Sequence, residues 1–401
     1  MKTNILKINP KDNVLVALQD LPQHTIIEFE GLAIALQETI PAKHKFYIHD
    51  MNTADAVIMY GVLVGKIQYD VPAGTRMSTE NLKHASEPYA YRNALFEWHA
   101  PDISRFAGRT FNGYHRADGR VGTANYWLFI PTVFCENRNL DVIREALHNE
   151  LGYAVTDKYK HFAHQLLEAH NKGETLENID LSPSVTIQNR PFKNVDGIKF
   201  LNHQGGCGGI RQDAAVLSKL LAAYADHPNV AGVTVLSLGC QNLQVQDFMA
   251  DLKAHNPNFD KPLYIFEQQQ SLSEEQLISE AIRKTFQGLV EINKLKRQPA
   301  TLDKLCLGVK CGGSDGFSGI SANPAVGYCA DLVVALGGQV LLAEFPELCG
   351  VEQEIIDRSA DQPTAEKFIH LMKSYDRIVT NAGSSFSMNP SPGNIKDGLI
   401  T

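Results

Sequence analysis

The fold is decided by the stretch Val230-Ala231-Gly232-Val233-Thr234-Val235-Leu236-Ser237-Leu238-Gly239-Cys240. A continuous apolar run that ends at glycine is typical of a strand buried on both faces of a sheet. Helical periodicity follows over residues 243–255, then a short apolar strand over 263–266 and a long helix over 273–295. Strands that alternate with helices predict a mostly parallel sheet with helices on both of its faces.

The same alternation extends to both sides of this stretch. Strands are expected at 126–131 and 198–201, with helices at 139–151 and 211–225. Further on, strands are expected at 305–309 and 340–343, with helices at 324–336, 350–358 and 365–375. The predicted fold class is α/β, with Rossmann-like units in a first catalytic domain (111–300) and a second α/β domain (301–401). A Pro-Gly-rich loop at 391–394 leads into a last apolar segment, so we expect this second domain to be incomplete at its C-terminus.

Residues 1–85 show a different sequence pattern, in which many short apolar strands are separated by Pro and Gly turns. Two Pro-Ala turns, at Pro41-Ala42 and Pro72-Ala73, repeat within this part. Such a pattern predicts a small, independent β domain. Residues 86–110 break the periodicity and form a predicted linker, whose aromatic side chains are expected to pack on a neighbouring surface.

Composition excludes several classes of function. The 401 residues carry a net charge of −8 and contain no dense Lys/Arg block, so neither nucleic acid nor an anionic membrane is expected as a partner. No apolar run approaches the roughly 20 residues that cross a bilayer, and the N-terminus lacks a secretory signal. The seven scattered cysteines do not indicate a disulfide framework and leave thiols for metal or redox chemistry.

Three cysteines follow predicted strands and lie beside glycine: Cys207, Cys240 and Cys311. Because the carboxyl ends of parallel strands share one edge of a sheet, these thiols are expected to converge there. Three thiolates with an open position suit iron, or an iron–sulfur cluster with one iron free for substrate. His203, on the Cys207 loop, is a candidate ligand or base. The alternative is that small buried cysteines end strands for packing reasons.

Other polar residues stand in glycine-punctuated loops. Ser314, Asp315 and Ser318 follow Cys311 in the loop that leaves its strand. Arg116 and Arg120 enter a strand and are candidates for gripping a carboxylate, with a solvated turn as the alternative.

Several long motifs resemble a known family: Gly113-Tyr114-His115-Arg116-Ala117-Asp118-Gly119-Arg120-Val121-Gly122, Leu238-Gly239-Cys240-Gln241-Asn242, Cys311-Gly312-Gly313-Ser314-Asp315-Gly316-Phe317-Ser318-Gly319-Ile320 and Asn389-Pro390-Ser391-Pro392-Gly393-Asn394. They resemble the altronate and galactarate dehydratases, over essentially the whole chain. The β domain, with Lys43-His44-Lys45-Phe46, resembles the SAF (β-clip) domain that precedes the catalytic part in that family. Phe345-Pro346-Glu347 and the fused SAF domain are most similar to altronate dehydratase.

The resemblance implies a cytoplasmic lyase of hexuronate catabolism that depends on Fe²⁺ or Mn²⁺. It would remove water from D-altronate to give 2-dehydro-3-deoxy-D-gluconate. The site residues expected on this basis are catalytic His44, His203, Lys310 and Asp315; substrate-binding Arg116, Arg120, Ser314, Ser318 and Asn242; and metal-binding Cys207, Cys240 and Cys311. His44 would have to reach the site from the SAF domain. The partner is a small-molecule sugar acid, and a homodimer is expected.

The sequence departs from the family pattern at two places. Ala124 stands where members usually have arginine, and the chain ends at Thr401, where members continue with a Gly-Cys segment. Three alternatives stay open: a galactarate dehydratase, a sulfolactate sulfo-lyase on the same scaffold, and a sugar-acid-binding protein without catalysis.

Overall fold

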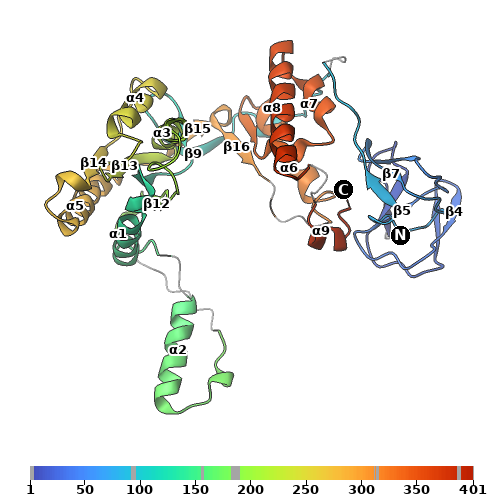
Figure 1. Cartoon of the computed structure of the whole chain (residues 1–401), viewed down its shortest axis with the longest axis horizontal. Helices are drawn as coiled ribbons and strands as arrows, with labels where there is room; N and C mark the ends of the chain where they lie inside the picture. Colours follow the sequence, from blue (N-terminus) through green and yellow to red (C-terminus); the bar gives the residue numbers. More distant parts are fainter. Residues whose placement is uncertain are drawn as a thin grey trace. The chain divides into compact units, whose positions relative to one another are not determined.

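The computed structural model describes residues 4–91, 96–154, 158–181, 190–310, 312, 316–385 and 390–400 (Figure 1). The chain forms two compact units. The central unit comprises Gly108–Lys304, and the terminal unit comprises Met1–Ala107 together with Leu305–Thr401. The N-terminal β domain and the last quarter of the chain therefore belong to the same unit.

The central unit contains a four-stranded parallel sheet in the order β12-β11-β13-β14. Its strands are β11 (Tyr126–Pro131), β12 (Gly197–Phe200), β13 (Val230–Ser237) and β14 (Leu263–Glu267). All eight residues of β13 are buried, as its apolar sequence predicts. The parallel α/β fold predicted from the alternation is confirmed.

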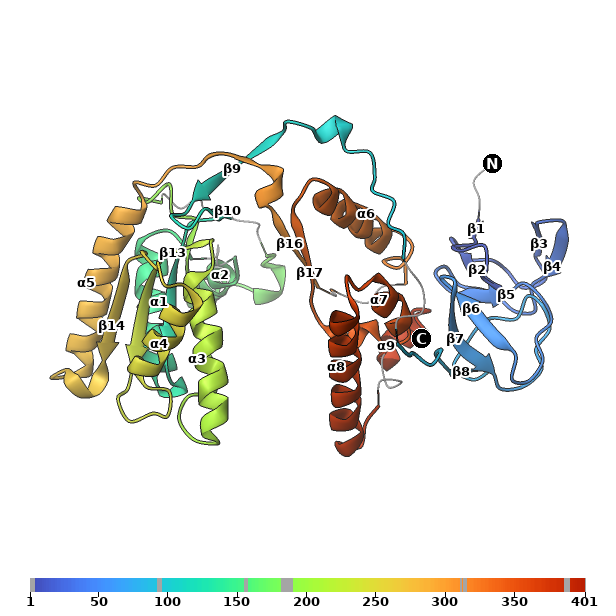
Figure 2. The ribbon, with the colours of Figure 1, turned by 90° about the horizontal axis from the view of Figure 1, so that it is seen from above.

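Helices cover both faces of this sheet (Figure 2). Alternate residues of β11 point to opposite faces, because side chains alternate along a strand. Trp127 and Phe129 pack in the core with α1 (Asn137–Glu150) and α5 (Glu274–Ile292). Leu128 and Ile130 pack in the core with α3 (Arg211–Asp226) and α4 (Val245–His255). The Ser273 hydroxyl accepts from the Gln276 amide and caps α5.

Two features of the central unit were not predicted. One is a small antiparallel sheet, β10-β9-β15, formed by β9 (Thr110–His115), β10 (Val121–Gly122) and β15 (Gln298–Thr301). It joins the two ends of the unit in sequence. The other is α2 (Lys158–Lys172), whose largely polar sequence buries only Ala169. Neither of these elements shows the apolar periodicity from which the other strands and helices were predicted.

The β domain of the terminal unit has eight short strands, arranged in small sheets: β1 (Ile5–Leu6), β2 (Val14–Ala17), β3 (Ile26–Phe29), β4 (Leu32–Ala35), β5 (Lys45–Tyr47), β6 (Ala56–Met59), β7 (Val62–Ile67) and β8 (Leu82–His84). The predicted β domain is therefore confirmed. The aromatic residues of the linker behave in two ways. Tyr89 packs against the α7–α8 core, and Arg358 stacks on Phe96 at 4.4 Å. Tyr91 and Trp98 are exposed, so the expected packing holds only in part.

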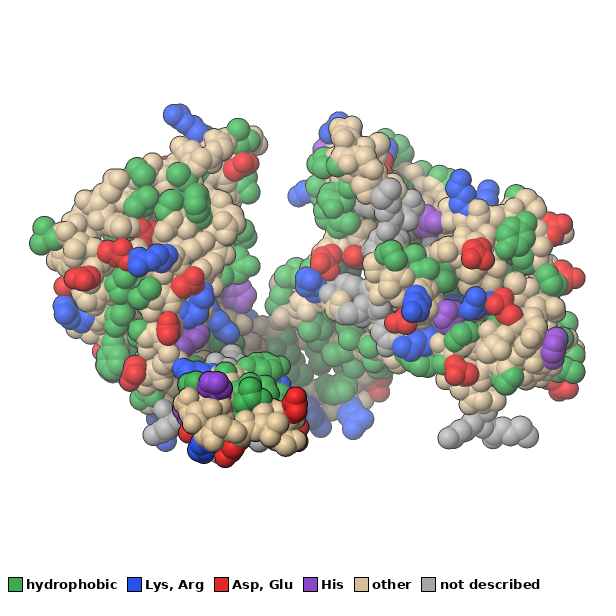
Figure 3. All heavy atoms as spheres, turned by 60° about the horizontal axis from the view of Figure 1, so that its bottom comes forward, with side chains coloured by type: hydrophobic (Ala, Val, Ile, Leu, Met, Phe, Trp, Pro, Cys, Tyr) green, Lys and Arg blue, Asp and Glu red, His purple; other side chains and the backbone are tan. Residues whose placement is uncertain are grey.

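The remaining part of the terminal unit is a second, smaller α/β arrangement. β16 (Cys306–Val309) and β17 (Gln339–Leu342) form a parallel pair. The helices are α6 (Ala322–Ala335), α7 (Glu352–Arg358), α8 (Gln362–Asn381) and α9 (Pro392–Lys396). No helix in the described ranges is both long and apolar enough to cross a membrane. On the face shown in Figure 3, Lys and Arg side chains are interspersed with Asp and Glu.

Candidate functional site

Three loops leave the parallel sheet of the central unit at the carboxyl ends of neighbouring strands. Cys135 follows β11 in a 3-10 turn (Phe134–Glu136), Cys207 follows β12, and Cys240 follows β13. Since β11 lies between β12 and β13, all three loops share one edge, called here the cysteine edge. Open α/β sheets bind their ligands at such an edge.

Backbone hydrogen bonds hold the loops of the cysteine edge together. The Phe134 amide donates to the Gly205 carbonyl at 3.0 Å, and the Asn242 amide donates to that of Gly206 at 2.9 Å. The Asn242 side chain donates to the Cys207 carbonyl at 2.5 Å. Gly206 has a φ of +93°, and a Cβ there would lie 2.1 Å from the Thr132 carbonyl oxygen. Only glycine allows the Cys207 loop to approach β11 this closely.

The thiols gather at this edge. Burial raises the pKa of the Cys135 thiol, and the thiols of Cys207 and Cys240 raise it further. Cys135 and Cys240 are exposed, and Cys207 is half-buried. In the part of the chain that the structure describes, no three His, Cys, Asp or Glu side chains are already spaced as ligands around one metal ion. Cys311 lies outside the described residues, so the predicted trio stays a prediction.

His203 has a structural position within the cysteine edge. Its Nε2 lies 2.7 Å from the Pro131 carbonyl oxygen, and its Nδ1 accepts from the Gly205 amide at 3.1 Å. Both ring nitrogens are therefore used to fix the turn that carries Cys207. A neutral ring bonded in this way has no lone pair for a substrate or a metal. The geometry favours a positioning role over the predicted roles of base or ligand.

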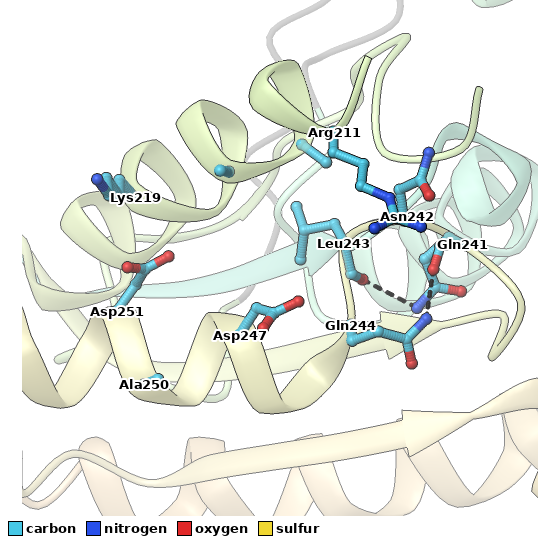
Figure 4. Close-up of a pocket in the computed structure, with 11 residues that line it drawn as sticks. Arg211, Lys219, Gln241, Asn242, Leu243, Gln244, Asp247, Ala250 and Asp251 are labelled. Atoms are coloured by element: carbon cyan, nitrogen blue, oxygen red, sulfur yellow. Dashed lines mark hydrogen bonds between the residues drawn. The ribbon is translucent and has the colours of Figure 1, made fainter. Parts of the chain in front are cut away.

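A groove of about 590 Å³ runs beside the cysteine edge, between α3 and α4 (Figure 4). Asn242 and Arg211 lie at one end of it, and the acidic pair Asp247 and Asp251 lies farther along. Asn242 thus borders a cavity, as expected of a binding residue, while its amide also holds the Cys207 loop.

Arg116 and Arg120 lie at the opposite edge of the sheet. Arg116 donates to the carbonyls of Pro228 and Ala124, which precede β13 and β11. Arg120 pairs with Asp118 and with the buried Asp226, at 2.5 and 2.6 Å. Their charges are committed to holding the β9–β10 turn on the sheet. The structure does not bring these two arginines to the cysteine edge, although they were expected to bind the carboxylate of the substrate.

In the terminal unit, Cys311, Ser314 and Asp315 lie outside the described residues, but both ends of their loop are described. Lys310 forms an exposed ion pair of 3.1 Å with Glu344, across the carboxyl ends of β16 and β17. Exposed pairs of this kind contribute little to stability. Ser318 lies in the turn that follows the loop, and its carbonyl accepts from the Asn323 amide at 2.8 Å.

This turn packs directly against the β domain. A Cβ on Gly316 would lie 2.8 Å from Cβ of Lys43, and one on Gly319 would lie 2.6 Å from the Tyr60 hydroxyl. Lys43 and Tyr60 have positive φ values of 76° and 58°. Non-glycine residues with positive φ are strained and concentrate at functional sites. The glycines of the motif thus allow close approach of the β domain, and the partly buried Ile320 packs against its core.

His44 also lies where the β domain meets the last residues of the chain, a place called here the junction. Its ring lies against Gly398, where a Cβ would be 3.1 Å from Cδ2 of His44. Burial lowers the pKa of His44, and the charges of Arg76 and Lys45 lower it further; a backbone contact with Lys396 acts in the opposite direction. The imidazole is therefore neutral near pH 7. Its Nδ1 is buried without a hydrogen-bond partner among the described residues.

Comparison with curated proteins decides the family. The chain is 30% identical to the altronate dehydratase of Escherichia coli (strain K12) over 401 residues, which cover 99% of this chain and 71% of that protein. The chain belongs to the altronate and galactarate dehydratase family. It is also 28% identical to the altronate dehydratase of Bacillus subtilis (strain 168), over 99% of this chain and 71% of that protein. Identity to the galactarate dehydratase (L-threo-forming) of Escherichia coli (strain K12) is 27%, over 98% and 69%.

Three family models match in succession. The altronate/galactarate dehydratase SAF domain matches residues 3–85. The D-galactarate dehydratase/altronate hydrolase second domain matches residues 113–293, and the D-galactarate/altronate dehydratase C-terminal model matches residues 302–401. The resemblance of the sequence motifs to this dehydratase family is thus confirmed.

Sequence reasoning assigned no role to three residues of these sites. Cys135 has no neighbouring glycine, although its position just after a predicted strand was a usable signal. Lys45 is 2% exposed and donates to the Gly398 carbonyl at 2.7 Å, whereas a lysine in a strand ordinarily indicates solvent. Tyr60 gives no local signal, because its partner Gly319 is distant in sequence. In this dehydratase, the Ala124 carbonyl accepts a hydrogen bond from Arg116.

Proposed function

We propose that this chain, a hydro-lyase of the altronate and galactarate dehydratase family, removes water from D-altronate to give 2-dehydro-3-deoxy-D-gluconate. The names of the relatives support this substrate, and altronate dehydratases are the two that match best in identity among those compared above. The structural observation that carries the proposal is His44: a neutral imidazole with an unpartnered buried Nδ1, set in a cationic junction.

The reaction requires a base of this kind. The proton on the carbon next to the carboxylate must be removed, and the hydroxyl on the following carbon must leave. The Nδ1 lone pair of His44 takes the first proton, and the imidazolium so formed can return a proton to the departing hydroxyl, which leaves as water. The resulting enol becomes the 2-keto acid by tautomerisation, so no oxidant or reductant is needed.

Positive charges around His44 suit an anionic sugar acid. The cations whose charges act on its ring are Arg76 and Lys45. The same charges that keep the imidazole neutral attract a carboxylate and stabilise the negative charge that develops when its neighbouring carbon loses a proton. The overall charge of −8 gives no such attraction, so the local cations must supply it.

The family also implies iron or manganese, but no three Cys, His, Asp or Glu side chains of the described residues at the cysteine edge are placed to hold either ion. Thiols are soft donors, a type that suits iron better than manganese. The homodimer and the cytoplasmic location implied by the resemblance stay predictions.

The test is a substrate panel on the iron-reconstituted, anaerobically prepared chain. D-Altronate, galactarate and sulfolactate are supplied in turn, and keto-acid formation and sulfite release are measured. The proposal expects keto acid from D-altronate with a higher kcat/KM than from galactarate. Preferred turnover of galactarate or sulfolactate would replace it with one of the alternative lyases. Saturable binding of D-altronate without any keto acid would identify a non-catalytic sugar-acid-binding protein.

A further inference from the structure

The turn that ends α9 has a fixed shape. Gly398 follows the helix with a φ of +93°. Its amide donates to the Ile395 carbonyl at 3.0 Å, and the Leu399 amide donates to the Asn394 carbonyl at 3.0 Å. These two bonds form a Schellman motif, which needs a residue of positive φ, usually glycine, at this position. The stretch Pro392-Gly393-Asn394, singled out in the sequence, thus leads into a rigid turn.

Gly398 contacts three consecutive residues of the β domain. Its carbonyl accepts from the Lys45 amine at 2.7 Å. A Cβ at Gly398 would lie 3.1 Å from Cδ2 and 3.2 Å from Cγ of His44, and 3.1 Å from the Lys43 carbonyl oxygen. Gly398 is buried, and the partly buried Ile400 packs against the core of the β domain. The turn after α9 is therefore docked at close range on the residues around the start of β5.

The Lys45 amine is difficult to explain by packing. The side chain is almost completely buried, and removing an ammonium group from water is unfavourable unless it is hydrogen-bonded. A methionine would fill the same space without a charge to desolvate. The hydrogen bond that compensates for this burial is the one to the Gly398 carbonyl. The amine therefore serves the contact with the turn after α9.

This contact bears on the orientation of the His44 ring. Nδ1 of His44 is buried without a hydrogen-bond partner among the described residues. A nitrogen that is kept free to take a proton cannot also hold the ring in place, so packing has to do so. Gly398 lies against the Cγ–Cδ2 side of the ring. A general base works only when it is held close to its productive geometry by such supporting contacts.

We propose that Lys45 is a positioning residue of this dehydratase: by holding the Gly398 carbonyl, it keeps the turn after α9 against the His44 ring and so fixes the orientation of the base. The inference rests on the proposed function for the role of His44, whereas the contact itself can be tested without turnover. The variant Lys45→Met also removes a charge that attracts the substrate carboxylate. Gly398→Ala keeps this charge and separates the two effects.

The first experiment measures the accessibility of His44 in the full 401-residue chain. Wild type and variants are treated at pH 7 with diethyl pyrocarbonate, which acylates unprotonated imidazole, and each histidine is quantified by mass spectrometry. In Lys45→Met, His44 should be labelled about 10-fold faster, the scale set by loss of one hydrogen bond from a charged group. The exposed His49 should be labelled equally in both proteins. Lys66→Met, which removes an exposed lysine of β7, is the matched control.

The direction of this change identifies its cause. The charge of Lys45 lowers the pKa of His44, so removing the charge alone would raise this pKa and slow the labelling. Faster labelling therefore reports a ring that is less covered. Circular dichroism checks that each variant is folded. Lys45→Met is expected to fold, because methionine leaves no buried charge.

The second experiment measures keto-acid formation from D-altronate by Gly398→Ala. The new Cβ would meet the His44 ring, and a φ of +93° is strained for alanine, so the turn should be displaced. His44 should again be labelled faster. The expected loss in kcat is about 10- to 100-fold, the scale that misplacement of a catalytic group costs, with KM within a few-fold of wild type. Gly393→Ala on α9, whose Cβ meets nothing within 4 Å, is the control.

Each outcome decides between the claims. Wild-type labelling of His44 in Lys45→Met and Gly398→Ala overturns the proposal. Faster labelling with unchanged kcat also overturns it, because the orientation of the ring would then not limit the reaction. If His44→Gln loses turnover while the other two variants keep it, the base stands and only its positioning by Lys45 is refuted. Wild-type turnover by His44→Gln refutes the proposed base and the positioning role together.

Discussion

Replacing Lys45 by methionine isolates the energetic cost of the charge buried at the junction. Lys45 lies on β5 with 2% of its surface exposed, and its amine donates to the Gly398 carbonyl at 2.7 Å. Burial lowers the pKa of Lys45 from 10.5 to about 8. In the unfolded chain this lysine has an ordinary pKa. The difference corresponds to about 3 kcal/mol of destabilisation while the amine is charged.

The sign of the pH dependence follows from proton binding. Between pH 8 and 10.5 the unfolded chain holds a proton on Lys45 that the folded chain has released. Unfolding in this range therefore takes up a proton, and rising pH opposes it. The free energy of unfolding of the wild type is expected to increase relative to that of Lys45→Met, by about 3 kcal/mol between pH 7 and the upper end of this range.

The assay is urea denaturation followed by circular dichroism at pH 7, 8, 9 and 10. Subtracting the variant from the wild type removes the contributions of all groups that both proteins share. Lys66→Met, which removes an exposed lysine from β7 of the same domain, is the matched control for the loss of a lysine side chain. A Lys45→Met difference that is flat with pH, or that falls, would refute the assignment of a buried charged amine.

Two further predictions concern the same junction. Gly316→Ala would place a Cβ 2.8 Å from Cβ of Lys43 and 3.0 Å from the Asp397 carbonyl oxygen, so it should lower the free energy of unfolding by about 1–3 kcal/mol in urea titrations. In the control Gly308→Ala the new Cβ meets nothing within 4 Å, so the free energy of unfolding should not fall in this way. Equal effects of the two substitutions would contradict the close approach at Gly316. Arg76→Gln removes a charge that lowers the pKa of His44, so this pKa should rise and the acid limb of the pH profile of kcat/KM for D-altronate should move to higher pH. An acid limb that stays in place would exclude His44 as the titrating base.

Much of the central unit could be predicted because its strands are continuous apolar runs. β13 is buried along its whole length, and the helix cap at Ser273 is local in sequence. The positions of Cys207 and Cys240 after strands were also predictable, since strand direction places them at one edge. Cys135 was not singled out, because the prediction looked for glycine beside each thiol, and Cys135 follows β11 without one.

Contacts between distant segments could not be predicted. The Lys45 amine and the Gly398 carbonyl are separated by more than 350 residues in the chain, and no local pattern links them. Arg120 shows the opposite failure. A guanidinium in a glycine-rich loop indicates an anion site, yet its partner is the buried Asp226 of the same unit. Sequence alone does not distinguish an arginine that binds a substrate from one that holds a turn.

The central claim is that His44 is the base in dehydration of D-altronate, and one comparison tests it most directly. The rate of keto-acid formation is measured for His44→Gln and for His49→Gln, an exposed histidine of the same domain, at equal iron content. The account predicts a loss of about 100-fold or more in kcat for His44→Gln, the range of general acid–base catalysis, and wild-type turnover for His49→Gln. Turnover by His44→Gln within a few-fold of wild type would contradict it.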